Sequence, residues 1–240
     1  MNDIIEISNL NKWFKSKRAL CDLTLSVKEG ELFGLLGVNG AGKTTLIKIL
    51  CGLTKKSDGS VLIGGYDLDQ NIDKIKEIVD ISPQETSVAL NLSVKENLDF
   101  FASIYNNCDT EYIEQIIDTF KLNEVLNQRA KTLSGGYKRR LSIAIALISK
   151  PKILFLDEPT LGLDVFARRE LWGIINKLKQ KVTIILTSHY LEEIENLCDR
   201  VAILSKGELL KVGTITEIKE SANADTFEQA FISVVEGANE

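Results

Sequence analysis

The sequence predicts an α/β fold in which a helical lobe interrupts a core of alternating strands and helices. Residues 31–36 form an apolar strand. Residues 153–156 and 182–186 form short, almost continuous apolar runs, which is typical of parallel strands buried on both faces. Residues 87–148 instead carry apolar side chains at helical spacing. The core is therefore assembled from two separate parts of the chain.

The N-terminal part is predicted to contain strands followed by one helix. Residues 4–8 and 20–27 alternate or are rich in apolar residues, residues 29–30 form a turn, and the strand at 31–36 leads into a glycine-rich loop. The helix after this loop has one apolar face. That face comprises Leu46, Ile49, Leu50 and Leu53.

The lobe is predicted to contain three helices. Ser93 and Glu96 have the spacing of a capping box, and Ser134 is placed to cap a helix that is apolar nearly all round and stops before Pro151. Two apolar stripes mark the other helices. They are Val94, Leu98, Phe101 and Tyr105, and then Ile113, Ile116, Ile117 and Phe120.

Strands and helices alternate again after the lobe. Strands are predicted at 200–204 and 208–212, and residues 225–235 are predicted to form a short amphipathic helix. A helix also separates the runs 153–156 and 182–186. Its apolar face comprises Leu171, Ile174, Ile175 and Leu178.

Composition restricts the class of protein. Of the 240 residues 44% are hydrophobic and 26% charged, as in globular domains, and the net charge of -5 argues against broad nucleic-acid binding. No basic-then-apolar leader opens the sequence, and no apolar run approaches the roughly 18 residues that span a bilayer. We therefore expect a cytoplasmic chain. Its scattered cysteines, without metal-ligand or redox spacing, are expected to be reduced; they are Cys21, Cys51, Cys108 and Cys198.

Residues 37–44 fit the phosphate-loop pattern G-x-x-x-x-G-K-[ST], with a strand before and a helix after. Glycines let the backbone N–H groups wrap a phosphate beside a helix N-terminus, Lys43 reaches the outer phosphates, and Thr44 holds Mg²⁺. The alternative, a glycine-rich turn with a surface lysine, is disfavoured by both flanks. The predicted nucleotide-binding residues are Gly37, Asn39, Gly40, Ala41, Gly42, Lys43, Thr44 and Thr45.

Three further sites carry polar groups suited to the same chemistry. Asp157 and Glu158 end an apolar strand, where the first suits Mg²⁺ and the second suits a general base. Ser134, with Gly135 and Gly136 behind it, forms either an ordinary helix cap or a second anion-binding helix start. Two such starts in one chain are unexpected unless two chains share each nucleotide. The only histidine, His189, follows a strand end, where ligands bind in open α/β sheets, although a lone histidine is more often structural.

Together these motifs resemble the nucleotide-binding domain of the ATP-binding cassette (ABC) transporter family, over about residues 4–213. The resemblance implies a P-loop NTPase core with an N-terminal antiparallel β subdomain (1–86 and 150–215), an inserted helical subdomain (87–149) and a helical tail (216–240). It also implies that Phe14 stacks on adenine, with Trp13 as the alternative. Residues 161–164 resemble the loop that bridges the two ATP sites of the family's dimers.

The resemblance also implies roles for the remaining polar residues. Gln84 corresponds to the glutamine that contacts Mg²⁺ or the attacking water, and His189 to the switch histidine on the γ-phosphate. Residues 134–136 resemble the signature that grips ATP bound by the opposite subunit. The catalytic set is thus Glu158, His189, Gln84 and Lys43, and the metal set is Thr44, Gln84 and Asp157.

One departure concerns the signature, which usually ends in glutamine but here continues as Tyr137 and a basic run at 138–140. This variant resembles exporter-type ATPases encoded apart from their membrane subunit. We interpret the basic run itself as a solvated face.

The resemblance implies an ATPase with ATP and Mg²⁺ as cofactors. It implies a dimer, with a second copy or a similar subunit, that drives an integral membrane permease from the cytoplasmic face. Two alternatives are a soluble ABC ATPase acting on nucleic acid or ribosomes, and a regulatory module without hydrolysis. The first usually has a long coiled-coil insertion or two cassettes, and the second would lack catalytic residues. The cargo cannot be read from a subunit that does not touch it.

Residues 84–101 join the predicted γ-phosphate sensor to the start of the lobe. Val88, Ala89, Leu90 and Leu92 precede the capping box without helical or strand period. They are expected either to pack under the lobe or to form a groove for a short cytoplasmic helix of the membrane subunit.

Overall fold

The computed structural model describes residues 2–105 and 109–238, which form two sheets and their flanking helices. The smaller sheet is antiparallel, in the order β2 (Lys17–Lys28), β1 (Asp3–Phe14), β4 (Asp58–Ile63) and β5 (Tyr66–Asp67). The larger sheet has the order β10 (Glu208–Gly213), β9 (Arg200–Ser205), β3 (Leu32–Leu36), β8 (Thr183–Ser188), β7 (Ile153–Asp157) and β6 (Val79–Ser82). Its strands are parallel except β10, which is antiparallel to β9.

The central strands of the larger sheet carry a hydrophobic core on each face. Every residue of β3, β7 and β8 is buried. Successive side chains of a strand point to opposite faces, so Leu154 and Ile184 join the core that includes the helical lobe. Phe33 and Phe155 join the core beneath the smaller sheet. The runs 153–156 and 182–186, predicted as parallel strands buried on both faces, are confirmed, and so is the apolar strand predicted at 31–36.

The parallel pairing also brings three strand ends to one edge of the sheet. Leu36 of β3 lies opposite Ser188 of β8, and Asp157 of β7 lies opposite Thr187. The glycine-rich loop after β3, the two acids after β7 and the histidine after β8 are therefore neighbours. This edge is where open α/β sheets bind their ligands.

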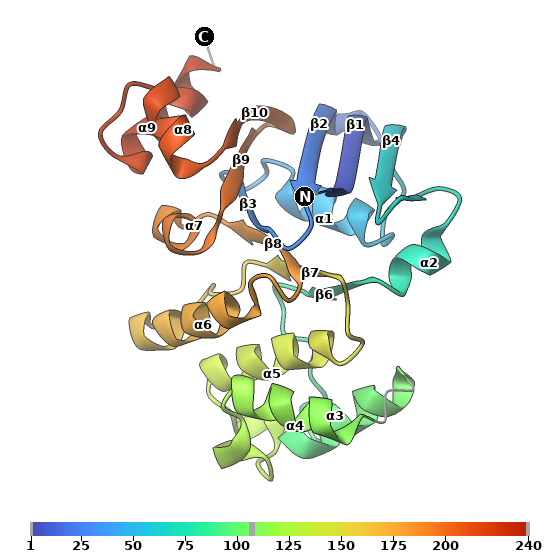
Figure 1. Ribbon diagram of the computed structural model, residues 1–240. Coiled ribbons are helices and arrows are strands. Elements are labelled where there is room, and N and C mark those ends of the chain that lie inside the picture. Colours follow the sequence, from blue (N-terminus) through green and yellow to red (C-terminus); the bar gives the residue numbers. More distant parts are fainter. Residues whose placement is uncertain (1, 106–108, 239–240) are drawn as a thin grey trace.

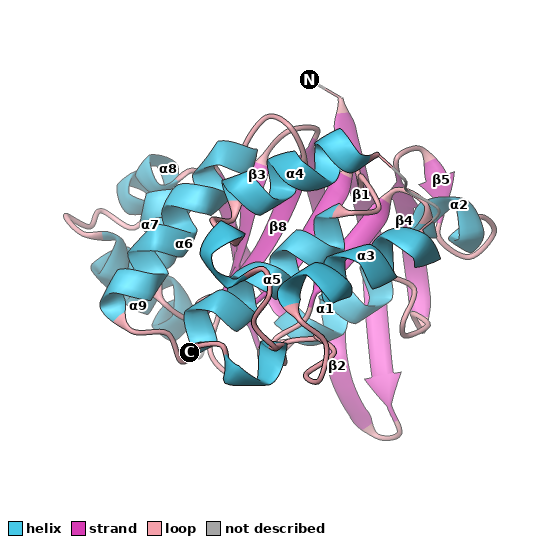
Figure 2. Ribbon diagram, turned by 90° about the horizontal axis from the view of Figure 1, so that it is seen from below, coloured by secondary structure: helices cyan, strands magenta, loops and turns pink. Residues whose placement is uncertain are grey.

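The helical lobe lies away from the smaller sheet (Figure 1), and from below its helices are seen in front of the strands (Figure 2). The predicted Ser93 capping box and Ser134 cap are both present. The lobe comprises α3 (Val94–Ile104), α4 (Thr110–Thr119) and α5 (Gly135–Leu147), with short 3-10 turns η1 (Asn123–Val125) and η2 (Ala130–Thr132) between the last two.

The remaining helices follow or flank the strands. They are α1 (Lys43–Leu50), α2 (Ile72–Lys76), α6 (Val165–Leu178), α7 (Leu191–Leu197), α8 (Ile215–Ser221) and α9 (Phe227–Gly237). The predicted apolar face of α6 is buried. At the C-terminal end, α8 and α9 pack together beside β10 (Figure 1), so the predicted amphipathic helix is confirmed as α9.

Two residues of the predicted apolar stripes do not belong to the core. Leu53 is 62% exposed, because α1 ends at Leu50 and the chain turns away at Gly52, whose φ is +68°. Tyr105 is 41% exposed at the end of α3, where its hydroxyl donates to Asp80 Oδ2 at 3.0 Å. Helical spacing alone did not reveal where each helix stops.

The interpretation of residues 138–140 as a solvated face is wrong. Arg139 is 3% exposed and Arg140 is 7% exposed. Both side chains enter the protein from the buried helix α5, where each finds hydrogen-bond acceptors. Burial without such acceptors would be too costly for a guanidinium.

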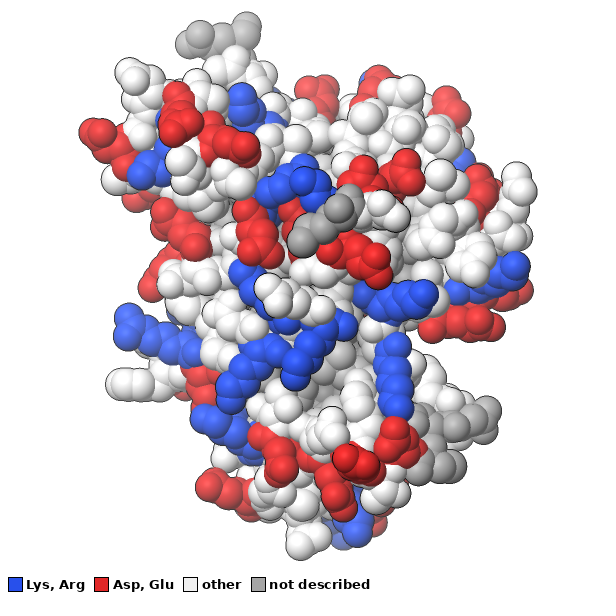
Figure 3. Space-filling model, in the orientation of Figure 1, with Lys and Arg blue, Asp and Glu red and all other residues white. Residues whose placement is uncertain are grey.

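On the face of the molecule shown in Figure 3, a band of basic side chains crosses the middle between acidic groups.

In the described part of the chain, no helix is long and apolar enough to cross a membrane. Cys21, Cys51 and Cys198 are free thiols, and burial raises the pKa of Cys51. Cys108 lies outside the described residues.

Candidate functional site

The glycine-rich loop between β3 and α1 has the backbone that a phosphate cradle requires. Gly40 and Gly42 adopt φ of +84° and +105°, a region that favours glycine. A Cβ at Gly42 would also stand 2.9 Å from the Ala19 carbonyl oxygen and 2.8 Å from Leu20 Cδ2. The loop therefore leads into the N-terminus of α1 with its backbone N–H groups uncovered by side chains.

Lys43 begins α1 and folds back over this loop. Its Nζ donates to the Gly37 carbonyl at 2.5 Å and lies 3.8 Å from Glu158 Oε1, and the residue is 6% exposed. Burial lowers the pKa of Lys43, and the nearby Glu158 carboxylate opposes this shift. The ammonium is thus held at the loop, where it can reach the outer phosphates of a nucleotide.

The two acids after β7 are anchored by a threonine of the neighbouring strand. Thr187 Oγ1 donates to Asp157 Oδ1 at 2.6 Å and accepts from the Glu158 backbone N–H at 2.9 Å. Thr44 Oγ1 donates to the same Asp157 oxygen at 3.4 Å. Thr187 is not among the residues predicted from the sequence, although its place at the end of a buried strand is a signal that could have found it.

The oxygen atoms of Thr44 and Asp157 fit a magnesium ion, which prefers a few oxygen ligands together with substrate phosphates. Thr44 and Gln84 also line one pocket of the protein. No cluster of three or more His, Cys, Asp or Glu side chains that suits a metal occurs in the described chain.

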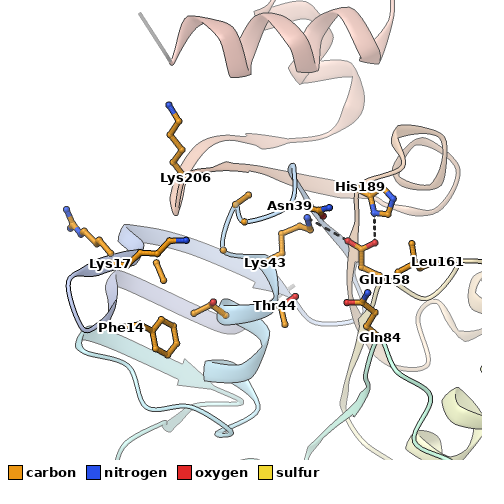
Figure 4. A pocket seen from close by; sticks show the side chains of 16 residues that line it. Phe14, Lys17, Asn39, Lys43, Thr44, Gln84, Glu158, Leu161, His189 and Lys206 are labelled. Carbon is orange, nitrogen blue, oxygen red and sulfur yellow. Dashed lines mark hydrogen bonds and ion pairs between the residues drawn. The ribbon is translucent and has the colours of Figure 1, made fainter.

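Glu158 is held between a cation and the histidine. Its Oε2 hydrogen bonds with His189 Nδ1, while its Oε1 faces Lys43 (Figure 4). The backbone of Glu158 is left-handed, with φ of +48°, which is uncommon for a residue other than glycine. The carboxylate is 10% exposed, so its position is strongly constrained.

Lys43, Thr44 and Glu158 line a pocket of about 710 Å³. The predicted residues Gly37 and Asp157 are not among its described lining residues. Phe14 projects from β1 on the side of the pocket opposite Glu158 and Gln84 (Figure 4). The lining residues that the sequence predicted are Phe14, Asn39, Gly40, Ala41, Gly42, Lys43, Thr44, Thr45, Gln84, Glu158 and His189. Leu161 also lines the pocket and belongs to the segment that resembles the bridging loop. The lining residues that sequence reasoning did not predict are Lys17, Arg18, Ala19 and Lys206, which come from segments without a motif.

The signature residues Ser134, Gly135 and Gly136 are not part of the pocket wall within the described chain. Ser134 caps α5, its hydroxyl accepting from the Tyr137 N–H at 3.4 Å, and both Ser134 and Gly135 are exposed. Tyr137 is directed back into the lobe, where its hydroxyl lies 3.3 Å from Glu124 and its ring lies under Arg140. The N-terminus of α5 is therefore open to a second molecule.

A sequence model of the family described as ABC transporter matches residues 20–161. The chain belongs to this family. The linearmycin resistance ATP-binding protein LnrL of Bacillus subtilis is 36% identical over 99% of this chain and 76% of its own length. The probable multidrug ABC transporter ATP-binding protein YbhF of Escherichia coli is 39% identical over 97% of this chain, which spans 42% of it. The human phospholipid-transporting ATPase ABCA3 is 39% identical, and the chain spans 13% of it.

Solved structures agree with this assignment. An ATP-binding subunit of an ABC transporter superposes with a TM-score of 0.85 at 28% identity, over 97% of this chain and 99% of that one. The cbiO1 protein of Clostridium perfringens superposes with a TM-score of 0.81 at 25% identity, over 92% and 96% of the two chains. The predicted P-loop NTPase fold is confirmed. The chain is an ATP-binding, ATP-hydrolysing subunit of an ABC transporter.

The pocket geometry favours Phe14 over Trp13 as the adenine contact. The two rings are similarly exposed and each lies near a cation, Lys12 over Phe14 and Arg18 over Trp13. Of the two, only Phe14 is among the described residues that line the pocket. We predict that Phe14→Ala weakens ATP binding by about 1–3 kcal/mol, the size of a base–aromatic stack, and that Phe14→Tyr is nearly silent. Titration calorimetry with Trp13→Ala as the control checks this. A larger loss in Trp13→Ala would reverse the assignment.

Proposed function

We propose that two copies of this chain close on two ATP molecules and drive a separate integral membrane permease from the cytoplasmic face, as the motor of an exporter. One observation carries the proposal. The pocket is lined by residues suited to phosphate chemistry, yet the chain's own signature residues are not among its described lining residues. A second copy related by a two-fold axis would supply them to each nucleotide.

In the proposed reaction Glu158 removes a proton from the water that attacks the γ-phosphate. His189 supports this role, since it binds one carboxylate oxygen and faces the pocket. Lys43 binds the outer phosphates, and Gln84 orients the water. Thr44 and Asp157 would hold Mg²⁺, which neutralises charge that develops on the phosphates.

The proposed ATP grip uses the open N-terminus of α5. Its first N–H groups and the positive end of the helix dipole favour a phosphate. Ser134 and Gly135 are exposed and Gly136 is half-buried, so a partner's nucleotide can approach them. Because Tyr137 is directed back into the lobe, its side chain does not obstruct this approach. This supports binding of a partner's nucleotide at the signature residues, although the signature sequence is altered.

The names of the relatives support export. They refer to linearmycin resistance, multidrug transport and phospholipid transport. The alternative of an ATPase acting on nucleic acid gains no support from the face in Figure 3, whose basic band is flanked by acidic groups. The alternative of a module without hydrolysis is disfavoured by the intact set around Glu158.

The segment 88–92 provides the proposed contact with the permease. Val88 packs against the hydrophobic core, so this part of the segment has a structural role. The Asn97 side chain binds the backbone of Ala89 at both its N–H and its carbonyl, and the Leu90 carbonyl accepts from the Lys131 N–H. The backbone is thus fixed while the Leu90 side chain is 52% exposed. An apolar anchor on a rigid support suits docking of a short helix.

We predict that Leu90→Glu leaves the chain folded and able to bind ATP but lowers its recovery with the membrane subunit at least about tenfold. A charge at a buried contact leaves an uncompensated group when the complex forms. The measurement is affinity purification from detergent-solubilised source membranes, with quantification of co-purified integral membrane protein. Leu53→Glu is the matched control, because Leu53 is 62% exposed and lies after α1.

Two outcomes would count against this part of the proposal. Unfolding of Leu90→Glu would place the residue in the core instead. Recovery of a membrane protein at wild-type level with Leu90→Glu would show that the permease docks elsewhere. If the wild-type chain recovers no membrane protein, the proposal that it works with a permease is contradicted.

A further inference from the structure

Arg139 directs its guanidinium at the residues that carry the hydrolytic chemistry. Its Nε donates to the Pro159 carbonyl at 2.8 Å, and its Nη2 donates to the Asp157 carbonyl at 2.7 Å. These two carbonyls belong to the residues immediately before and after Glu158. The side chain is 3% exposed, and burial lowers the pKa of Arg139 to about 10, so the group stays charged near neutral pH.

The residue between these carbonyls has the unfavourable backbone. Glu158 has φ of +48°, and a non-glycine residue keeps such a conformation only when its surroundings enforce it. The Thr187 hydroxyl fixes the Glu158 N–H from one side. Arg139 holds the peptide group before Glu158 through the Asp157 carbonyl, and the peptide group between Pro159 and Thr160 through the Pro159 carbonyl. The direction in which the Glu158 carboxylate leaves the chain therefore depends on this guanidinium.

The third nitrogen of the same side chain reaches a different segment. Arg139 Nη1 donates to the Pro83 carbonyl and lies 3.4 Å from the Gln84 carbonyl. One planar group thus joins the backbones of the two segments that present Glu158 and Gln84 to the pocket. Only an arginine offers this fork of donors, since a lysine ammonium acts from a single point.

Arg139 itself belongs to α5, the helix whose first turn is formed by Gly135 and Gly136. Arg139 lies about one turn after Gly135 in α5. A shift of α5 on binding a phosphate at its N-terminus would therefore reach the backbone of Glu158 through Arg139. The neighbouring Arg140 has a different role. It binds Glu170 and the Phe120 carbonyl, and it lies over the Tyr137 ring.

We infer that Arg139 is a positioning residue. Its guanidinium holds the left-handed backbone of Glu158 so that the carboxylate points at the attacking water. The same guanidinium links this arrangement to the backbone of Gln84 and to α5. It does not touch the nucleotide. This inference rests on the proposed role of Glu158 as general base.

The test is a double-mutant cycle between Arg139→Met and Glu158→Gln, with single-turnover ATP hydrolysis as the readout. In the chain with Glu158, Arg139→Met is expected to lower the hydrolysis rate at least about tenfold, while the Kd for ATP changes less than about threefold. In the Glu158→Gln background the same change is expected to cost less than about twofold, because there is no base left to aim. Arg139→Lys, which keeps the charge but loses the fork, is expected to lie between.

Arg140→Met is the matched control. It removes a buried arginine from the same helix, and we expect it to lower the melting temperature without coupling to Glu158→Gln. A purely structural role of Arg139 would lower hydrolysis equally in both backgrounds, and that result would overturn the inference. If Arg139→Met does not fold, the cycle is run with Arg139→Lys. Equal losses of hydrolysis rate in both backgrounds would again overturn the inference.

Failure of the inference and failure of the proposed function give different results. Normal turnover in Glu158→Gln alone would remove the general base and the inference with it. A large loss in Glu158→Gln, combined with unchanged hydrolysis in Arg139→Met, would leave the base in place and contradict only the clamp.

Discussion

Replacing Glu158 by glutamine is expected to lower ATP hydrolysis by on the order of 10²-fold or more while ATP binding persists, because an amide cannot accept the proton of the attacking water. The substitution keeps the size of a side chain that touches Lys43 and His189. The mutant should therefore accumulate as an ATP-bound dimer. Steady-state phosphate release, together with size-exclusion chromatography in ATP, measures both effects.

Glu192→Gln provides the control for this prediction. Glu192 is an exposed carboxylate three residues after His189, and it pairs with Arg168 at 3.8 Å outside the pocket. Its replacement should leave turnover near the wild-type value. Near-normal turnover in Glu158→Gln would show that another group, or the nucleotide itself, accepts the proton.

The substitution Ser134→Arg is expected to abolish both ATP-dependent dimerisation and hydrolysis while sparing ATP binding to the monomer. Ser134 is exposed and does not line the chain's own pocket, so a large side chain there obstructs only a partner's nucleotide. Fluorescent-nucleotide binding at low protein concentration, followed by light scattering at high concentration, separates the two properties.

Ser93→Arg controls for the helix cap that Ser134→Arg also removes. Ser93 caps α3 in a capping box, so its loss costs about 0.5–2 kcal/mol of stability, as at other N-caps, without reaching a nucleotide. We expect Ser93→Arg to dimerise and hydrolyse ATP at temperatures below its unfolding. Loss of monomer ATP binding in Ser134→Arg would contradict a site completed by a second chain.

The sequence was informative wherever function or burial imposes a local pattern. The strands β3, β7 and β8 are buried on both faces and read as continuous apolar runs. The phosphate loop and the caps at Ser93 and Ser134 are contiguous motifs, and they were predicted at the residues where they occur. Short elements escaped prediction, since α2 and α7 have only five and seven residues, too few to establish a helical period.

The sequence was misleading where the partners of a residue lie far away along the chain. Adjacent basic residues on a helix are usually solvated, but the acceptors of Arg139 belong to residues 83, 157 and 159 and become visible only when β6 and β7 are side by side. Thr187 likewise gains its role from pairing of β8 with β7. Such contacts follow from topology, which no local pattern in the chain encodes.

Mixing the Ser134→Arg chain with a Lys43→Ala chain tests the shared ATP site most directly. Each chain alone is expected to be inactive, since one lacks a usable signature and the other lacks the phosphate-binding lysine. In a mixed dimer, the intact loop of the first chain meets the intact signature of the second, which restores one competent site out of two. ATP hydrolysis is expected to return on mixing and to depend on the ratio of the two chains. Hydrolysis that stays absent at every ratio, while both chains remain folded, would contradict the shared ATP site.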